Sequence, residues 1–197
     1  MGSVPKVDFD APADKVINPQ KLAHVVLRVT NMRSSVAFYC DFLGGSVAHG
    51  DDVLTFISYD DEHHRIALGA LPNTGPKIPT SAGLHHIAFT FETLSELLLA
   101  YRQRKAKGML PVWCVNHGPT TSIYYQDPDA NMLETQVDNF DTNKEATNFM
   151  QSKYFAENPI GTDFDPEDLI ERLRKGEADA GLKRRVEMGP RGPPDFV

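Results

Sequence analysis

Apolar and polar positions alternate in two stretches of the chain that resemble each other, KLAHVVLRV at residues 21–29 and GLHHIAFTF at residues 83–91. Alternation with a period of two indicates a β-strand. Each stretch is followed by apolar residues at helical spacing, over 31–45 and 93–107, and then by three short apolar segments separated by Asp and Gly. The order strand, helix and three strands therefore occurs twice, which indicates a duplicated βαβββ module.

The repeat divides the chain into segments. We expect an N-terminal arm at 1–20, a first module at 21–71 and a second module at 83–138, joined by the Pro- and Gly-rich stretch LPNTGPKIPTSAG. Over residues 139–197 the sequence predicts C-terminal helices followed by a tail rich in Pro and Gly. One helix is predicted over 143–155, and another starts at Asp165 as N-cap with Pro166 in its first turn. Together these elements predict an α+β fold.

Alternation also sorts side chains onto the two faces of each strand. His24 and His86 each begin a strand on its less bulky face, opposite the residues that we expect to pack on the helices. In NMLETQVD the acidic Glu134 shares a face with Met132 and Gln136. We therefore expect His24, His86 and Glu134 to line a cavity on the face of the sheet that the helices do not cover.

Two interpretations of these three residues are open at this point. A histidine at the start of a strand is commonly a hydrogen-bonded structural residue, and Glu134 gives His86 a natural partner. However, a carboxylate in a half-buried strand is costly unless it is paired or bound to a cation. Two neutral imidazoles and one carboxylate also form the facial triad that holds non-haem Fe(II) and leaves coordination positions open.

Composition narrows the class of partner. The formal net charge of −7 argues against a nucleic-acid or anionic membrane surface, so a small molecule is the expected ligand. The beginning of the sequence lacks a secretory pattern and no run reaches membrane-spanning length, which predicts a cytoplasmic protein. Cys40 and Cys114 are expected to be buried free thiols. The oligomeric state is left open, a homo-oligomer included.

A longer motif covers the second module. The stretch HGPTTSIYYQDPDANMLE resembles the signature of the extradiol ring-cleavage dioxygenases, within the vicinal oxygen chelate superfamily (glyoxalases, bleomycin resistance proteins and dioxygenases). The matching positions are His117, Ile123, Tyr124, Asp127, Pro128 and Glu134. Ala130 departs from the signature, which has Gly or Pro there, although the surrounding Asp and Asn still suit a turn. The resemblance spans about residues 20–140.

The resemblance implies a fold and a metal site. The two modules would pair into a cupped eight-stranded mixed sheet, making 21–140 one functional domain with the C-terminal helices added to it. His24, His86 and Glu134 would hold Fe(II), or Mn(II) as the alternative, and no organic cofactor is expected. Glyoxalase-type members use a fourth ligand, an acid on the last strand of the first module, but that strand reads RIALGAL here. Three ligands favour the dioxygenase.

The resemblance also implies a reaction and further site residues. The substrates would be a catechol and O₂, with the ring opened next to the diol. Tyr124 and His117 would manage protons and developing charge, and His64, from the paired histidines in EHHRIAL, would act on the substrate hydroxyl. Each has a structural alternative, Tyr124 in the core and His117 in a turn. His49, His63 and His85 are expected at the surface.

Other members of the superfamily supply competing functions. An epimerase or a thiol transferase would also use two histidines and one glutamate, but would have no reason to keep His64, His117 and Tyr124 together. A glyoxalase-like lyase is a further metal-dependent alternative. A metal-free protein of the same fold that binds small molecules is the remaining alternative.

Overall fold

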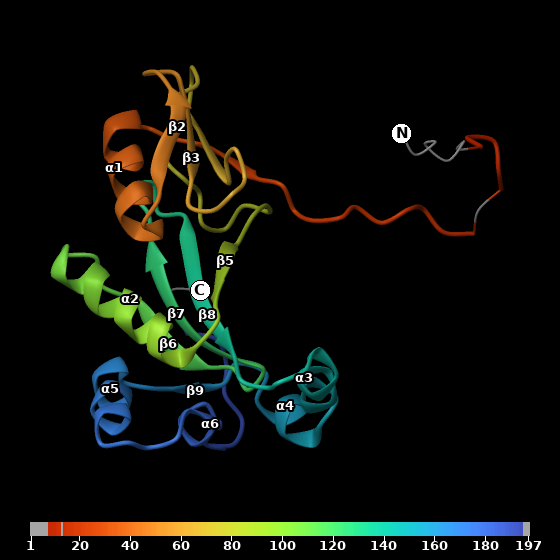
Figure 1. Ribbon diagram of the computed structural model, residues 1–197, viewed down its shortest axis with the longest axis vertical. Helices are drawn as coiled ribbons and strands as arrows, with labels where there is room; N and C mark the ends of the chain where they lie inside the picture. The colour runs from red at the N-terminus through yellow and green to blue at the C-terminus, as the bar shows by residue number, and fades with distance from the viewer. Residues whose placement is uncertain (1–7, 13, 195–197) are drawn as a thin grey trace, which may run out of the picture.

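The chain folds into two modules, each with a sheet of its own. A computed structural model describes residues 8–12 and 14–194, and Figure 1 shows the first module above the second. The first module contains β1 (Val25–Arg28), α1 (Met32–Leu43), β2 (Ser46–Gly50), β3 (Leu54–Ser58) and β4 (Ile66–Gly69). Its strands lie in the order β1-β4-β3-β2, with β1 parallel to β4 and the other neighbours antiparallel.

The second module repeats this arrangement. It contains β5 (His86–Phe91), α2 (Leu94–Ala106), β6 (Trp113–Asn116), β7 (Thr120–Gln126) and β8 (Met132–Asp138), in the strand order β5-β8-β7-β6. A short ninth strand, β9 (Thr162–Asp163), extends this sheet beyond β6. The predicted duplication and the α+β class are therefore confirmed.

The paired modules and mixed sheets are as expected, but the described strands form two sheets, of four and five strands, in place of one continuous sheet of eight. Among the described strands, β1 pairs with β4 alone and β5 with β8 alone. Strand β1, which directly follows His24, and strand β5, which begins with His86, therefore lie at open sheet edges, where one side of the backbone has no partner among these strands.

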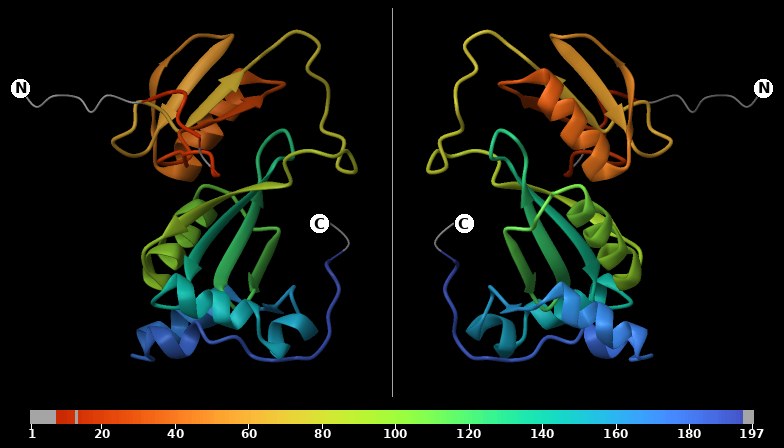
Figure 2. Two further views of the ribbon diagram at one scale, coloured as in Figure 1. Left: turned by 90° about the vertical axis from the view of Figure 1, so that its right-hand side faces the viewer. Right: turned by 90° about the vertical axis from the view of Figure 1, so that its left-hand side faces the viewer.

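A shared apolar core and one buried arginine hold the two modules together. Leu27 and Phe42 of the first module belong to the same buried cluster as Leu97 and Tyr125 of the second. Arg104, on α2, is 4% exposed and donates to the Phe42 carbonyl from Nε at 2.9 Å and from Nη2 at 2.7 Å. That carbonyl lies in the last turn of α1, where helix carbonyls lack intrahelical partners. Figure 2 shows the modules stacked, with helices beside both sheets.

The caps of α1 and α2 agree with the sequence. Asn31 caps α1 by accepting from the Ser34 amide, and Gly44 ends that helix at φ +65°, a left-handed conformation that glycine adopts easily. Thr93 and Glu96 form a capping box at the start of α2. These local signals set the helix bounds within one or two residues of those predicted.

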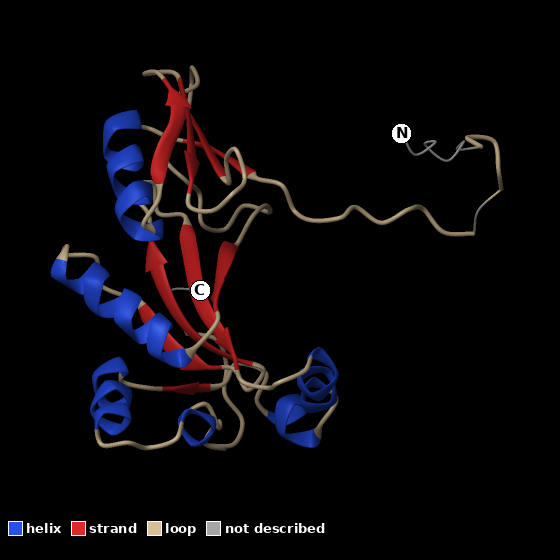
Figure 3. Ribbon diagram, viewed as in Figure 1, coloured by secondary structure: helices blue, strands red, loops and turns tan. Residues whose placement is uncertain are grey.

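The C-terminal part forms the end of the molecule farthest from the first module (Figure 3). Its helices are α3 (Asn143–Met150), α4 (Lys153–Glu157), α5 (Pro166–Arg174) and α6 (Asp179–Leu182). The predicted start of α5 at Asp165 is confirmed, since its side chain accepts from the Glu167 amide. The single helix predicted over 143–155 is broken, because Ser152 caps a new helix by accepting from the Phe155 amide. Within the described residues, no helix is long and apolar enough to cross a membrane.

The predicted N-terminal arm has no helix or strand where it is described, at 8–12 and 14–20, and it extends away from the first module in Figure 1. Residues 1–7 and 13 of the arm lie outside the described part, as do residues 195–197 of the predicted tail. Cys40 and Cys114 are free, as expected, but half-buried rather than buried. Burial raises the pKa of Cys114 to about 12, so this thiol is not a nucleophile.

The turn between β7 and β8 explains the position at which the signature is broken. The Asp127 carboxylate, 5% exposed, accepts from the Asn131 amide at 2.7 Å and from the Tyr39 hydroxyl at 2.8 Å. Ala130 sits in this turn at φ +63°. A side chain in the left-handed region costs about 1–2 kcal/mol, which glycine avoids.

Replacing Ala130 with Gly should therefore stabilise the protein by about 1 kcal/mol in chemical denaturation, because relief of the left-handed strain outweighs the added flexibility of the unfolded chain. Ala146→Gly, within helix α3, is the matched control and should cost about 1 kcal/mol. Equal destabilisation by both substitutions would contradict the strained turn.

Candidate active site

The candidate active site begins with a carboxylate buried in the second sheet. Glu134 lies in the middle of β8, in register with Ala88 of β5 and Tyr124 of β7, and is 4% exposed. Its Oε2 lies 3.0 Å from Nε2 of His86. Burial alone would raise the pKa of the Glu134 carboxyl. Hydrogen bonds from His86 and Ser122 have the opposite and larger combined effect, so the pKa lies below its usual value. Glu134 is therefore ionised at neutral pH.

A second pair of polar side chains lies next to this carboxylate. Nε2 of His117 lies 2.9 Å from the Tyr124 hydroxyl, and Nδ1 of His117 lies 2.5 Å from the Ile160 carbonyl oxygen. Burial lowers the pKa of His117. Burial and the charge of Glu134 raise the pKa of Tyr124. At neutral pH the histidine is therefore neutral and the tyrosine keeps its proton.

Aromatic rings close this part of the site. The ring of Trp113 stacks on Tyr124 at 5.1 Å between centroids, and its Nε1 donates to Asp163 at 2.7 Å. The ring of His86 meets the ring of Tyr124 edge-on at 5.7 Å. His86, His117 and Tyr124, together with Glu134, thus form one continuous cluster on the face of the second sheet opposite the main core.

The remaining predicted site residues lie in the first module. The His24 and His64 rings are 4.4 Å apart between centroids, and Phe56 packs against His64 at 4.8 Å. Nδ1 of His63 lies 2.6 Å from Nδ1 of His64. Partial burial and these neighbouring histidines lower the pKa of His64. His49, His63 and His85 are exposed, as the sequence predicts.

The two clusters do not meet in a single site. Among the residues that the structure describes, no three His, Cys, Asp or Glu side chains are grouped closely enough to hold a metal ion. His86 and Glu134 are brought together, whereas His24 lies with His64 in the loops that precede β1 and β4 of the first module. Between the two open edges there is a cavity of about 140 Å³, with His24 and Val25 on one side and Ile87 to Phe89 on the other.

Several residues that contact the site were not predicted from the sequence. Ser122 precedes Tyr124 by two positions on β7 and faces Glu134, which strand alternation could have shown. Ile160 and Arg185 reach His117 from the C-terminal part, at 43 and 68 residues' separation. A contact made by a backbone carbonyl in a loop leaves no signal in the sequence pattern.

Comparisons with known proteins identify the family of this chain. The model of the Glyoxalase/Bleomycin resistance protein/Dioxygenase superfamily matches residues 21–135. The chain is 45% identical to biphenyl-2,3-diol 1,2-dioxygenase 2 of Rhodococcus globerulus, over 79% of this chain and 83% of the relative. It is 40% identical to biphenyl-2,3-diol 1,2-dioxygenase 3 of the same organism, over 84% and 88%.

Solved structures agree on the fold. A glyoxalase/dioxygenase from Nostoc punctiforme matches with a TM-score of 0.50 at 22% identity, covering 64% of this chain and 99% of the other. The chain belongs to the Glyoxalase/Bleomycin resistance protein/Dioxygenase superfamily. The resemblance to ring-cleaving dioxygenases that the signature suggested is thereby confirmed.

The hydrogen bond between Tyr124 and His117 should contribute measurably to stability. Tyr124→Phe removes the hydroxyl and leaves the partly buried Nε2 of His117 without this partner, which should cost about 1–3 kcal/mol in chemical denaturation. Tyr154→Phe, at a side chain that is 46% exposed, is the control and should change stability by less than about 0.5 kcal/mol. Equal effects of the two substitutions would show that the hydrogen bond contributes nothing.

Proposed function

We propose that this protein is an extradiol dioxygenase, which opens the aromatic ring of a catechol next to the diol and incorporates O₂. The observation that carries the proposal is the identity of 45% and 40%, over most of the chain, to two biphenyl-2,3-diol dioxygenases. The signature from His117 to Glu134 supports it, because the structure groups the polar side chains of that stretch in one cluster.

The proposed metal ligands are His24, His86 and Glu134, with Fe(II) as the ion and Mn(II) as the alternative. The donor chemistry supports this choice, since two imidazoles and a carboxylate suit a non-haem iron that keeps open positions. Strand β4, which reads Ile66–Gly69, offers no fourth acid. When bound, the metal would act as a Lewis acid and template for the diol and O₂.

Only two of these three ligands are adjacent within one chain. His24 directly precedes the edge strand β1, whereas His86 begins the edge strand β5 and Glu134 lies beside it on β8, so a second copy of the chain can supply what each half lacks. Symmetric pairing of β1 with the partner's β5 would create two identical sites and satisfy both sheet edges. We propose this dimer as the active form. His64 packs against His24 and would enter the site with it.

The protein's own residues then have defined tasks. Glu134 is ionised and binds cations, and the Tyr124 hydroxyl beside it is placed to hydrogen-bond a diol oxygen. His117 is neutral and hydrogen-bonded to Tyr124, so it can exchange a proton with that hydroxyl. The stacked rings of Trp113 and Tyr124 exclude water from this side of the site and offer an aromatic surface.

Ring cleavage can be tested directly. The protein is loaded with Fe(II) without air and then given biphenyl-2,3-diol or catechol and oxygenated buffer. We expect consumption of one O₂ per ring and a yellow ring-opened product, measured with an oxygen electrode and by absorbance. Loading with Zn(II), which cannot change oxidation state, is the control. Absence of turnover across several catechols would reject the dioxygenase.

The shared site can be tested by mixing two inactive variants. His24→Ala and Glu134→Ala each damage both sites of a dimer, but a mixed dimer keeps one intact site. After unfolding and refolding together, activity and bound metal should recover to about a quarter of the wild-type value, as random pairing predicts. As a control, a mixture of His86→Ala and Glu134→Ala should recover nothing. If the first mixture also recovers nothing although mixed dimers form, each site lies within one chain.

A further inference from the structure

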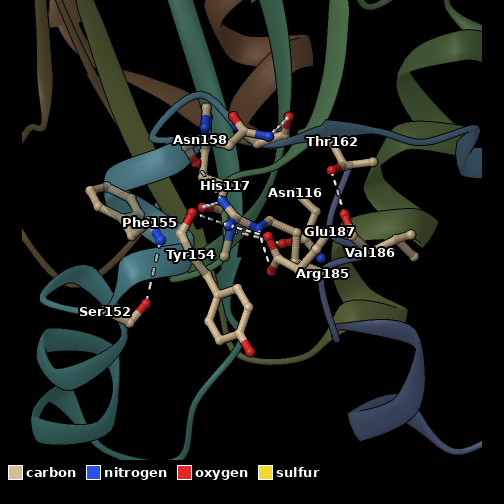
Figure 4. A network of polar contacts seen from close by, with 12 residues as sticks. Asn116, His117, Ser152, Tyr154, Phe155, Asn158, Thr162, Arg185, Val186 and Glu187 are labelled. Atoms are coloured by element: carbon tan, nitrogen blue, oxygen red, sulfur yellow. Dashed lines mark hydrogen bonds and ion pairs between the residues drawn. The ribbon is translucent and has the colours of Figure 1, made fainter. Parts of the chain in front are cut away.

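The C-terminal part of the chain contacts the candidate active site, although it lies outside the region that matches the superfamily. The matched region ends at residue 135, whereas β9 pairs with β6 through Val115 with Asp163 and Asn116 with Thr162. His117 follows directly after this pairing. Figure 4 shows the polar contacts that connect His117 with the C-terminal residues.

The first of these contacts fixes where the proton of His117 sits. Nδ1 lies 2.5 Å from the Ile160 carbonyl oxygen, which can only accept, so Nδ1 must carry a hydrogen. In a neutral imidazole the other nitrogen is then an acceptor. That nitrogen, Nε2, lies 2.9 Å from the Tyr124 hydroxyl, which must therefore be the donor. Burial, together with the charge of Glu134 and its hydrogen bond with the same hydroxyl, raises the pKa of Tyr124, so the hydroxyl keeps its proton.

The carbonyl that sets this arrangement is held rigidly. Asn158 is 1% exposed, and its side chain accepts from the Gly161 amide at 2.8 Å and donates to the Gly161 carbonyl at 3.1 Å. Gly161 has φ +108°, and a Cβ atom there would lie 2.3 Å from the Asn116 carbonyl oxygen. The turn 158–161 thus packs directly on the backbone next to His117, and Ile160 cannot move away without breaking these contacts.

Arg185 joins this turn to His117 from the other side. It is 7% exposed, and its Nη1 donates to the carbonyls of Asn158 at 2.7 Å and His117 at 3.1 Å. Its Nη2 donates to the Tyr154 carbonyl at 3.0 Å, and Nε and Nη2 bind the Glu187 carboxylate. Every N–H of the guanidinium therefore has a partner in the protein, so Arg185 acts on structure and has no donor left for a ligand.

We propose that Arg185 and the turn 158–161 are positioning elements that hold His117 with its proton on Nδ1, so that Nε2 receives the hydrogen bond of Tyr124. The arrangement of protons is a property of the protein itself. A catalytic role for these proton positions rests on the proposed function. In that function the Tyr124 hydroxyl would contact the substrate while His117, as a neutral base, accepts its hydrogen bond.

The proton position can be measured by nitrogen NMR on the full-length chain, labelled with ¹⁵N-histidine and kept free of paramagnetic metal. The His117 signals are assigned as those missing from His117→Gln. At neutral pH we expect a protonated Nδ1 and an unprotonated Nε2. A proton on Nε2, or rapid averaging of both forms in the wild type, would overturn the proposal.

The role of Arg185 is tested with Arg185→Gln, and Arg184→Gln is the matched control because Arg184 is the neighbouring arginine and is exposed. In Arg185→Gln we expect a second set of His117 nitrogen signals with the proton on Nε2, and in Arg184→Gln the wild-type spectrum. Circular dichroism checks that Arg185→Gln is folded. If it is not folded, Arg185→Lys is measured in its place. An unchanged His117 spectrum in the folded Arg185 variant would overturn its role.

These outcomes are independent of ring cleavage. If the wild-type protein shows the expected proton on Nδ1 but no turnover of any catechol, the proposed function fails and the positioning of His117 stands. If catechols are cleaved while the proton is on Nε2, the proposed function stands and the positioning is refuted.

Discussion

Glu134 is a carboxylate held almost out of water in the middle of a β-strand, and it remains charged. Such a group is expensive to bury unless hydrogen bonds and a positive partner compensate for the lost hydration. In this structure His86 and Ser122 provide that compensation from the two strands that flank β8. His86 is 34% exposed at its side chain, so the pair is open on one side. The pair therefore stabilises the sheet as it stands, and its open side is where the proposed metal ion would be held by both side chains.

The separation of the two sheets leaves open strand edges next to His24 and His86. Each module has a sheet and a capped helix of its own, and the two are fixed to each other by Arg104 and the shared core. Strand β1, which follows His24, and strand β5, which begins with His86, are left at open edges among the described strands. An edge strand exposes backbone groups that favour pairing with another chain. The same edges that separate the proposed metal ligands within one chain are therefore the surfaces through which the proposed dimer would bring them together.

Local patterns in the sequence predicted most of the fold. Alternation at 24–29 and 86–91, the cap at Asn31 and the Asp165–Pro166 start each depend on neighbouring residues, and the structure confirms them. The pairing of the modules depends on packing between distant segments, so one continuous sheet was inferred where two are present. The same limit applies to the site. The signature identified His117 and Tyr124. The contacts of Ile160 and Arg185 with His117 could not be predicted, because these residues are distant in the chain. The nearby elements β9 and α6 are too short to produce a periodic pattern in the sequence.

The proposed metal site is tested most directly by anomalous diffraction from crystals of the Fe(II)-loaded protein, because this measurement locates the metal independently of turnover. We expect one iron peak per chain beside the side chains of His86 and Glu134, with the His24 imidazole of a second copy completing the ligand set. An iron-loaded crystal in which His86 and Glu134 stay hydrogen-bonded to each other, with no metal peak beside them, would contradict it.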